Sequence, residues 1–116
     1  MATYKNLYIA NAFSINMLEN KNQYIHLIPE TLEGARAHLD GEHFTSAIGH
    51  ADTARIVGNM LGIELPDQRI NVTLHPHDGL LVAQYTGPRL AEGATKLPEG
   101  ASINFWMVEI DRERTR

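Results

Sequence analysis

The order of apolar and polar positions predicts a chain in which strands alternate with helices. Helical spacing of apolar residues occurs at residues 31–39 and 52–61, and a glycine soon after each segment is a stop signal. Short apolar runs and two-residue alternation mark the strand candidates, at residues 7–10, 24–28, 44–48, 70–74, 80–85 and 102–110. This mixed order is typical of an α/β (α+β) fold, so we expect a mixed β-sheet of about five strands flanked by helices.

Turn signals separate these elements. Two asparagines and a serine interrupt the apolar segment 11–18, so we expect Asn11 at a strand end and Ser14 or Asn16 near the start of a short helical turn. Pro29 is expected to close the second strand. Pro-His-Asp-Gly at 76–79 has turn chemistry and predicts a hairpin that joins the strand candidates on its two sides.

Length and composition indicate one globular domain. The chain has 116 residues, of which 43% are hydrophobic and 21% are charged, and this suffices for a single hydrophobic core. No internal repeat or linker divides it, so we expect residues 1–116 to form one domain. Residues 111–116 are all polar and are expected to form a frayed, flexible tail.

Charge and the lack of cysteine exclude several kinds of partner and site. The net charge of -4 disfavours binding to a long nucleic acid, although a small anion could still bind in a local pocket. A chain without cysteine has no disulfide, no thiolate nucleophile and no cysteine-based metal site. No apolar run has the ~18–20 residues of a membrane span, and no signal peptide is evident. We therefore expect a cytoplasmic protein without membrane contact.

His50 directly precedes the helix predicted at 52–61, where it could meet an anion. The N–H groups at a helix N-terminus point outward, and the helix dipole favours negative charge there. A histidine protonated in the presence of a phosphate could act as a general acid toward a departing oxygen. The alternative is that His50 merely caps the helix, and the sequence pattern alone leaves both interpretations open.

A glycine-flanked loop after the strand at 80–85 carries Arg89 and Glu92. A guanidinium matches the oxygens of a phosphate, and one helical turn at 89–92 would point both side chains the same way. Such a pair could bind an anion and tune a proton transfer. A solvated ion pair worth less than about 1 kcal/mol is an equally good interpretation.

His75, His77 and Asp78 are the only local candidates for metal ligands in the sequence. Imidazole and carboxylate groups bind divalent metals, but these three occupy a predicted turn and lack a convincing further ligand. We therefore expect solvated side chains, with no metal and no cofactor.

Three blocks of the sequence resemble the signature motifs of the viral ring nucleases. The blocks are residues 11–18 (NAFSINML), 47–50 (AIGH) with Thr53, and 89–93 (RLAEG). They occur in the family's order and at similar spacing over most of the chain. These small proteins of archaeal viruses and bacteriophages are anti-CRISPRs against type III systems, and relatives occur in cellular genomes.

The resemblance implies a homodimeric, metal-independent enzyme. The family binds cyclic tetra-adenylate across its two-fold axis and cleaves this second messenger of type III CRISPR systems to linear di-adenylates. By motif position, the catalytic histidine corresponds to His50, the phosphate-handling arginine to Arg89 and the loop glutamate to Glu92. The ligand-binding residues implied in the same way are Asn11, Ser14 and Gly49, together with Arg89.

Physical reasoning agrees with these roles. The ribose 2′-OH is an internal nucleophile, so the enzyme needs only to align it with the phosphorus. Arg89 and the helix N-terminus suit the charge that builds on the phosphorane, and His50 suits the leaving 5′-oxygen. The product would be a 2′,3′-cyclic phosphate. Glu92 could orient His50 or Arg89, or assist the 2′-OH.

Two other kinds of function are compatible with the sequence. A non-catalytic protein that sequesters the cyclic oligonucleotide would use the same binding residues without the general acid. A protein-binding module that inhibits a host complex would use a surface patch instead.

Overall fold

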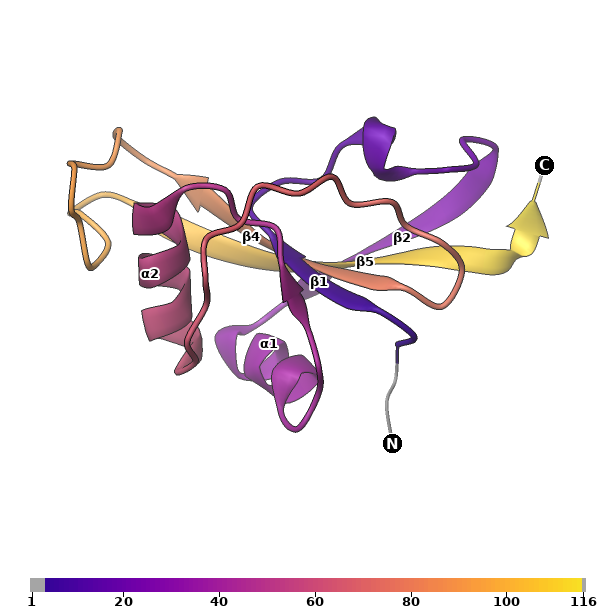
Figure 1. Cartoon of the computed structure of the whole chain (residues 1–116), viewed down its shortest axis with the longest axis horizontal. Coiled ribbons are helices and arrows are strands. Elements are labelled where there is room, and N and C mark those ends of the chain that lie inside the picture. Colours follow the sequence, from indigo (N-terminus) through magenta and orange to yellow (C-terminus); the bar gives the residue numbers. More distant parts are fainter. Residues whose placement is uncertain (1–3, 116) are drawn as a thin grey trace.

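Five strands form one mixed sheet with the strand order β2-β5-β4-β1-β3 (Figure 1). The structure is a computed structural model that describes residues 4–115. The strands are β1 (Leu7–Ala10), β2 (Gln23–Glu30), β3 (Thr45–Ser46), β4 (Gly79–Thr86) and β5 (Ser102–Thr115). The predicted α+β fold with a mixed five-stranded sheet is therefore confirmed.

The sheet has a parallel half and an antiparallel half that share β4. Strand β1 runs parallel to both β3 and β4. Strand β5 pairs antiparallel with β4 on one side and with β2 on the other. The carboxyl ends of β1, β3 and β4 consequently lie at one edge of the sheet, which is where α/β proteins place their ligands.

Two helices lie where the sequence predicts them. Helix α1 (Leu32–Leu39) begins at Thr31, whose hydroxyl accepts a hydrogen bond from the Gly34 N–H at 2.9 Å. Helix α2 (Ala51–Leu61) ends at Gly62, which has a left-handed φ of 72° that favours glycine. Neither helix is long and apolar enough to cross a bilayer, nor is any other helix within residues 4–115.

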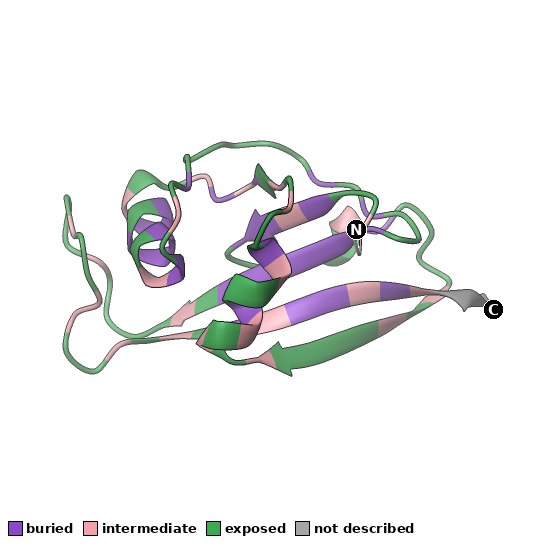
Figure 2. Ribbon diagram, turned by 90° about the horizontal axis from the view of Figure 1, so that it is seen from below, coloured by how far each residue is buried: buried purple, intermediate pink, exposed green. Residues whose placement is uncertain are grey.

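Both helices pack on the same face of the sheet (Figures 1 and 2). Their buried residues meet buried residues of β1, β4 and β5, among them Ile9, Leu81 and Met107, each with no exposed surface. Gly58 lies in the middle of α2, where glycine weakens a helix. A Cβ there would lie 2.9 Å from the Ile63 carbonyl oxygen, so the glycine allows the returning chain to pack closely on α2.

Irregular segments and one short 3-10 helix (Ile15–Met17), rather than α-helices, cover the opposite face. Residues 70–74 were predicted as a strand of a hairpin, and this prediction is wrong, because only an isolated bridge joins Leu74 to Leu18. Val72 and Leu74 are buried against β1, β4 and β5. Alternate side chains of this segment face the sheet while its backbone crosses over it, which produces strand-like alternation without strand pairing.

Strands β2 and β5 extend beyond their predicted limits. Pro29 lies within β2, opposite Trp106, rather than at its end. Because β2 is an edge strand, exposed along its length in Figure 2, it tolerates a residue without an N–H group. Strand β5 continues to Thr115, which pairs with Gln23, so the predicted flexible tail belongs to the strand up to that residue. Arg116 lies outside the described residues.

Tyr4 joins the segment before β1 to the sheet. Its hydroxyl donates a hydrogen bond to the Glu109 carboxylate. Its ring lies over Gly79, where an added Cβ would come within 2.7 Å of the ring. Burial, and then the hydrogen bond to Glu109, raise the pKa of Tyr4 above its usual value. The fold therefore favours the neutral phenol.

We expect the Tyr4–Glu109 hydrogen bond to make stability fall at alkaline pH. The phenol of the unfolded chain ionises near pH ~10, whereas the folded protein keeps the proton to higher pH. The free energy of unfolding then declines with pH by at most about 1.4 kcal/mol per unit from this group. The difference between wild type and Tyr4→Phe in urea denaturation should shrink from pH 8 to pH 11. A constant difference would contradict this assignment.

Candidate active site

The parallel half of the sheet brings the three sequence blocks to one edge. Asn11 follows the end of β1, His50 follows β3 and begins α2, and the loop 87–101 with Arg89 and Glu92 follows β4. In Figure 1 the loop extends beyond the end of the sheet beside α2. No hydrogen bond or ion pair joins these predicted site residues to one another within residues 4–115. The topology gathers them as separate groups around one edge.

The chain leading to His50 is held in place by a neighbouring segment. Strand β3 is shorter than the predicted 44–48, because the chain turns toward α2 after Ser46. Gln68 donates two hydrogen bonds to this turn. Its N–H donates to the Ile48 carbonyl at 2.8 Å, and its side-chain amide donates to the Ser46 carbonyl at 2.9 Å. Since Ile48 is also fully buried, the backbone before His50 has a fixed position.

His50 occupies the N-cap position of α2 but does not cap the helix with its side chain. Its backbone is extended, with φ -119° and ψ 123°, and the imidazole makes no capping hydrogen bond. The side chain is exposed. His50 therefore caps the helix only through its carbonyl, which accepts from the Ala54 N–H at 3.0 Å. The imidazole is available beside the outward N–H groups of the first helical turn.

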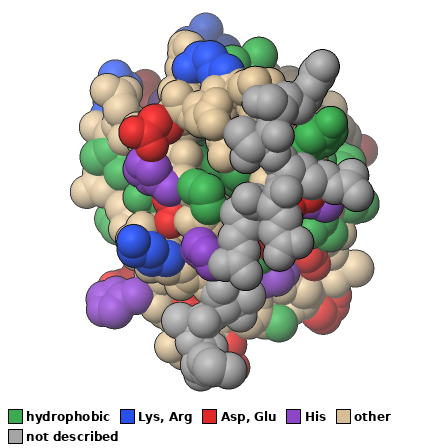
Figure 3. All heavy atoms as spheres, turned by 90° about the vertical axis from the view of Figure 1, so that its right-hand side faces the viewer, with side chains coloured by type: hydrophobic (Ala, Val, Ile, Leu, Met, Phe, Trp, Pro, Cys, Tyr) green, Lys and Arg blue, Asp and Glu red, His purple; other side chains and the backbone are tan. Residues whose placement is uncertain are grey.

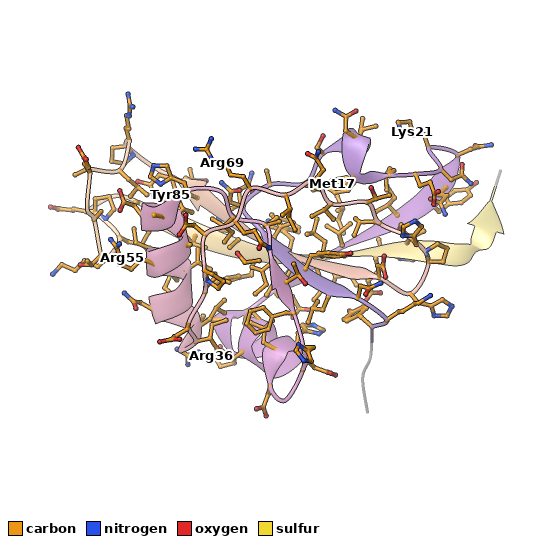
Figure 4. All side chains as sticks on the ribbon, viewed as in Figure 1. Met17, Lys21, Arg36, Arg55, Arg69 and Tyr85 are labelled. Atoms are coloured by element: carbon orange, nitrogen blue, oxygen red, sulfur yellow. The ribbon has the colours of Figure 1, made fainter. Side chains whose placement is uncertain are left out.

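Arg69 adds a cation that sequence reasoning missed. Its Nε donates to the Gly49 carbonyl at 3.1 Å, and its exposed side chain lies near the start of α2 (Figure 4). A Cβ on Gly49 would lie 2.7 Å from Cγ of Arg69, so the glycine lets Arg69 cross the chain just before His50. No spacing rule links positions 69 and 50, so only the tertiary contact reveals this neighbour.

Arg89 and Glu92 are both exposed and do not pair with each other. The segment forms no helical turn. The chain instead turns at Glu92 and Gly93, and the Ala94 N–H donates to the Ala91 carbonyl at 3.1 Å. The predicted ion pair is thus absent, which leaves the guanidinium of Arg89 free to meet an anion.

The two ends of this loop are held close together. Gly87 has a φ of 148°, and a Cβ there would lie 2.7 Å from Cβ of Ala101. The Tyr85 hydroxyl donates a hydrogen bond to the Pro88 carbonyl, just before Arg89. Close contact at the base and a hydrogen bond beside the arginine restrict the directions in which the loop can leave the sheet.

Ser14 has a local structural role. Its Oγ accepts a hydrogen bond from the Asn16 N–H at 3.2 Å and caps the short helix η1 (Ile15–Met17), as predicted. The hydroxyl proton can still be donated to a ligand. Asn11 is exposed at the end of β1. Both side chains can thus reach a molecule placed over this edge without breaking the turn.

An apolar groove of about 270 Å³ lies beside these residues. It is lined by Ala12, Phe13, Leu27, Val82, Gln84, Trp106 and Val108. Leu27 is 57% exposed, and the buried Nε1 of Trp106 has no hydrogen-bond partner within the described chain. A buried N–H group is nearly always paired in a complete structure. The exposed Leu27 and the Trp106 N–H, which lacks a partner within residues 4–115, make this groove a candidate contact surface.

His75 and His77 are exposed in this turn, as expected, whereas Asp78 is buried and has a structural role. The Asp78 carboxylate is buried and accepts hydrogen bonds from the Asn6 side chain at 2.9 Å and the His75 N–H at 3.0 Å. His75 also pairs with Glu19 at 2.8 Å. Figure 3 shows that histidine, acidic and basic side chains lie among one another on the right-hand side of the molecule. Burial, and then the charge of Asp78, raise the pKa of Tyr8. Residues 4–115 hold no cluster of three metal-ligating side chains.

Asp78→Ala is expected to lower the free energy of unfolding by about 2–3 kcal/mol, since the turn loses a buried charged acceptor that binds two donors. Denaturant titration measures the loss. Asp40→Ala is the matched control, because Asp40 is an exposed aspartate at the end of α1. A loss below about 0.5 kcal/mol for Asp78→Ala would show that the turn does not depend on this carboxylate.

Comparisons with known proteins were made for the whole chain. Residues 7–105 match the family model described as STIV B116-like. The chain is 33% identical over 108 residues to "Uncharacterized protein 26" of Sulfolobus islandicus filamentous virus (isolate Iceland/Hveragerdi), covering 90% of this chain and 91% of that protein. B116 of Sulfolobus turreted icosahedral virus has a similar structure, with a TM-score of 0.75 and 27% identity over 90% of this chain and 98% of that chain. The chain therefore belongs to the STIV B116-like family.

Proposed function

We propose that this protein is a metal-independent ring nuclease that cleaves cyclic tetra-adenylate to linear di-adenylates. Loss of this messenger would switch off type III CRISPR signalling in the cytoplasm, as an anti-CRISPR or as a cellular reset. One observation carries the proposal. The three sequence blocks that resemble the ring nucleases lie at the carboxyl edge of the parallel strands. One of them places a histidine at a helix N-terminus, and its imidazole makes no capping hydrogen bond.

The chemistry needs only groups found at this edge. The 2′-oxygen of a ribose attacks the adjacent phosphorus, a bond forms between them, and the bond to the 5′-oxygen breaks. His50 donates a proton to the departing 5′-oxygen, and Arg89 with the start of α2 stabilises the charge on the phosphorane. The product carries a 2′,3′-cyclic phosphate. Glu92 is exposed on the same loop, and its proposed role is to receive the proton of the 2′-OH or to orient His50 or Arg89.

Arg69 strengthens the case for an anionic substrate. Its Nε is bound to the Gly49 carbonyl, which leaves the terminal nitrogens without a partner in residues 4–115. Together with Arg89 it provides two cationic groups at this edge of the sheet in a chain whose net charge is -4. The local charge at this edge can therefore bind a phosphate although the protein as a whole is acidic.

A homodimer fits this substrate. A four-fold cyclic ligand on a two-fold axis offers opposite phosphodiesters to two equivalent sites, which accounts for two dinucleotide products. The apolar groove beside Asn11 and Ser14 is the candidate contact surface, because Leu27 is exposed there and Trp106 Nε1 lacks a partner. Sedimentation equilibrium should give about twice the 13.0 kDa of one chain.

The decisive experiment is a single-turnover incubation with cyclic tetra-adenylate in excess EDTA, analysed by liquid chromatography and mass spectrometry. Conversion to linear di-adenylates is the expected result. An intact ring would overturn the nuclease, and equilibrium dialysis of the same sample would then separate the two alternatives. Bound ring would indicate a protein that sequesters the messenger, and unbound ring a protein-binding module.

A further inference from the structure

Side chains on one face of α2 form hydrogen bonds with backbone atoms in the middle of the loop 87–101. Three side chains bind three consecutive residues of the loop. The pairs are Asp52 Oδ2 with Gly93 N at 3.0 Å, Arg55 Nη1 with Ala94 O at 3.5 Å, and Asn59 Nδ2 with Thr95 O at 3.1 Å. We call these three side chains the loop clamp.

Two side chains of the loop clamp, Asp52 and Arg55, also bind each other. Positions 52, 55 and 59 share one helix face. Asp52 Oδ1 accepts a hydrogen bond from Arg55 Nη1 at 3.2 Å, and the side chain of Asp52 is only 13% exposed. Figure 4 shows Arg55 directed from α2 toward the loop. The carboxylate of Asp52 thus joins a helix side chain to a loop amide.

The location of these contacts relates them to the proposed active site. The first contact is made to Gly93, the residue after Glu92, and Gly93 has a left-handed φ of 80°. Asp52 is two residues beyond His50 on α2. One helix therefore carries the proposed general acid at its start and, along its length, the side chains that hold the loop of Arg89 and Glu92.

We propose that Asp52, assisted by Arg55 and Asn59, is a positioning residue that fixes the loop of Arg89 and Glu92 relative to His50. The catalytic part of this inference rests on the proposed function. A carboxylate beside a phosphate site would otherwise repel the substrate. The pairing of Asp52 with Arg55 offsets that charge while the second oxygen binds the Gly93 amide.

The clamp can be tested on the ligand-free protein. We expect Asp52→Ala to increase hydrogen exchange of the Gly93 amide about tenfold and to accelerate trypsin cleavage after Arg89 and Lys96. Asp52→Asn keeps an oxygen acceptor, so its exchange should stay within about threefold of wild type. Glu99→Ala, an exposed substitution on the same loop, is the matched control and should change neither measurement.

A second variant tests the loop clamp independently, in case Asp52→Ala does not fold. Asn59→Ala removes a contact two turns further along α2, and we expect it to accelerate cleavage after Lys96, next to Thr95. Circular dichroism confirms that each variant is folded. Unchanged exchange at Gly93 in folded Asp52→Ala, or unchanged cleavage in folded Asn59→Ala, would overturn the clamp whether or not the protein is an enzyme.

The catalytic consequence is measured separately with cyclic tetra-adenylate. Asp52→Ala is expected to lower kcat about 10–100-fold with little change in Kd, since misplaced groups lose transition-state contacts first. Asp52→Asn should restore most of the loss. If Asp52 acted only by its negative charge, both variants would bind the ring more tightly and lose no kcat, which would overturn the positioning role. Absence of cleavage by wild type would refute the proposed function and leave the exchange result standing.

Discussion

His50→Ala is expected to lower the single-turnover rate of cyclic tetra-adenylate cleavage by about 10²–10⁴-fold, the usual contribution of a general acid. The imidazole makes no capping hydrogen bond, so its removal takes no partner from α2. Affinity should stay within about threefold of wild type, because the cations and the helix N-terminus that bind the phosphate are retained.

His43→Ala is the matched control for this experiment. His43 is an exposed histidine before β3 that makes no hydrogen bond or ion pair within residues 4–115, so its removal should leave both rate and affinity unchanged. If His50→Ala cleaved the ring as fast as wild type, the proton for the 5′-oxygen would have to come from another group, and our mechanism would be wrong.

Arg89→Ala is expected to reduce the cleavage rate by about 10²–10³-fold, similar to the loss of one charge-stabilising donor in other active sites. Arg89 is exposed and has no ion-pair partner in the part of the chain that the structure describes, so the loss does not reflect a broken internal ion pair. Arg89→Lys should recover only part of the rate, since an ammonium lacks the planar fork that matches two phosphate oxygens.

Arg69→Ala separates binding from catalysis in the same assay. Arg69 is tied to Gly49, before His50 in the chain, and we assign it to ligand binding. Its loss should raise Kd, with a steep dependence on salt, and reduce the single-turnover rate at saturation much less than Arg89→Ala. Equal effects of the two variants on the saturated rate would contradict this division of roles.

Local sequence signals were sufficient to predict the helices, which begin and end at residues typical of helix ends. Helix α2 begins one residue before its predicted start and ends at Gly62 as expected, because its apolar spacing and its glycine stop act locally. Helix α1 begins one residue after its predicted start, because Thr31 caps it, and it ends at Leu39 as predicted. The position of His50 at a helix N-terminus could therefore be predicted from the sequence.

Features that depend on distant contacts could not be predicted from the sequence. Residues 70–74 alternate like a strand because they pack over a sheet face, and periodicity does not distinguish that from pairing. The polar end of β5 pairs with β2 although its composition is typical of a tail. The contact of Arg69 with Gly49 and the hold of Asp52 on the loop likewise join segments that only the fold brings together.

The loop clamp recognises main-chain atoms alone. The N–H of Gly93 and the carbonyls of Ala94 and Thr95 are present whatever side chains those positions carry. Substitutions at 94 and 95 can therefore accumulate without loosening the loop, whereas position 93 is restricted by its left-handed backbone. Point mutations could therefore vary the outer surface of this loop over evolution while the geometry around Arg89 and Glu92 is inherited intact.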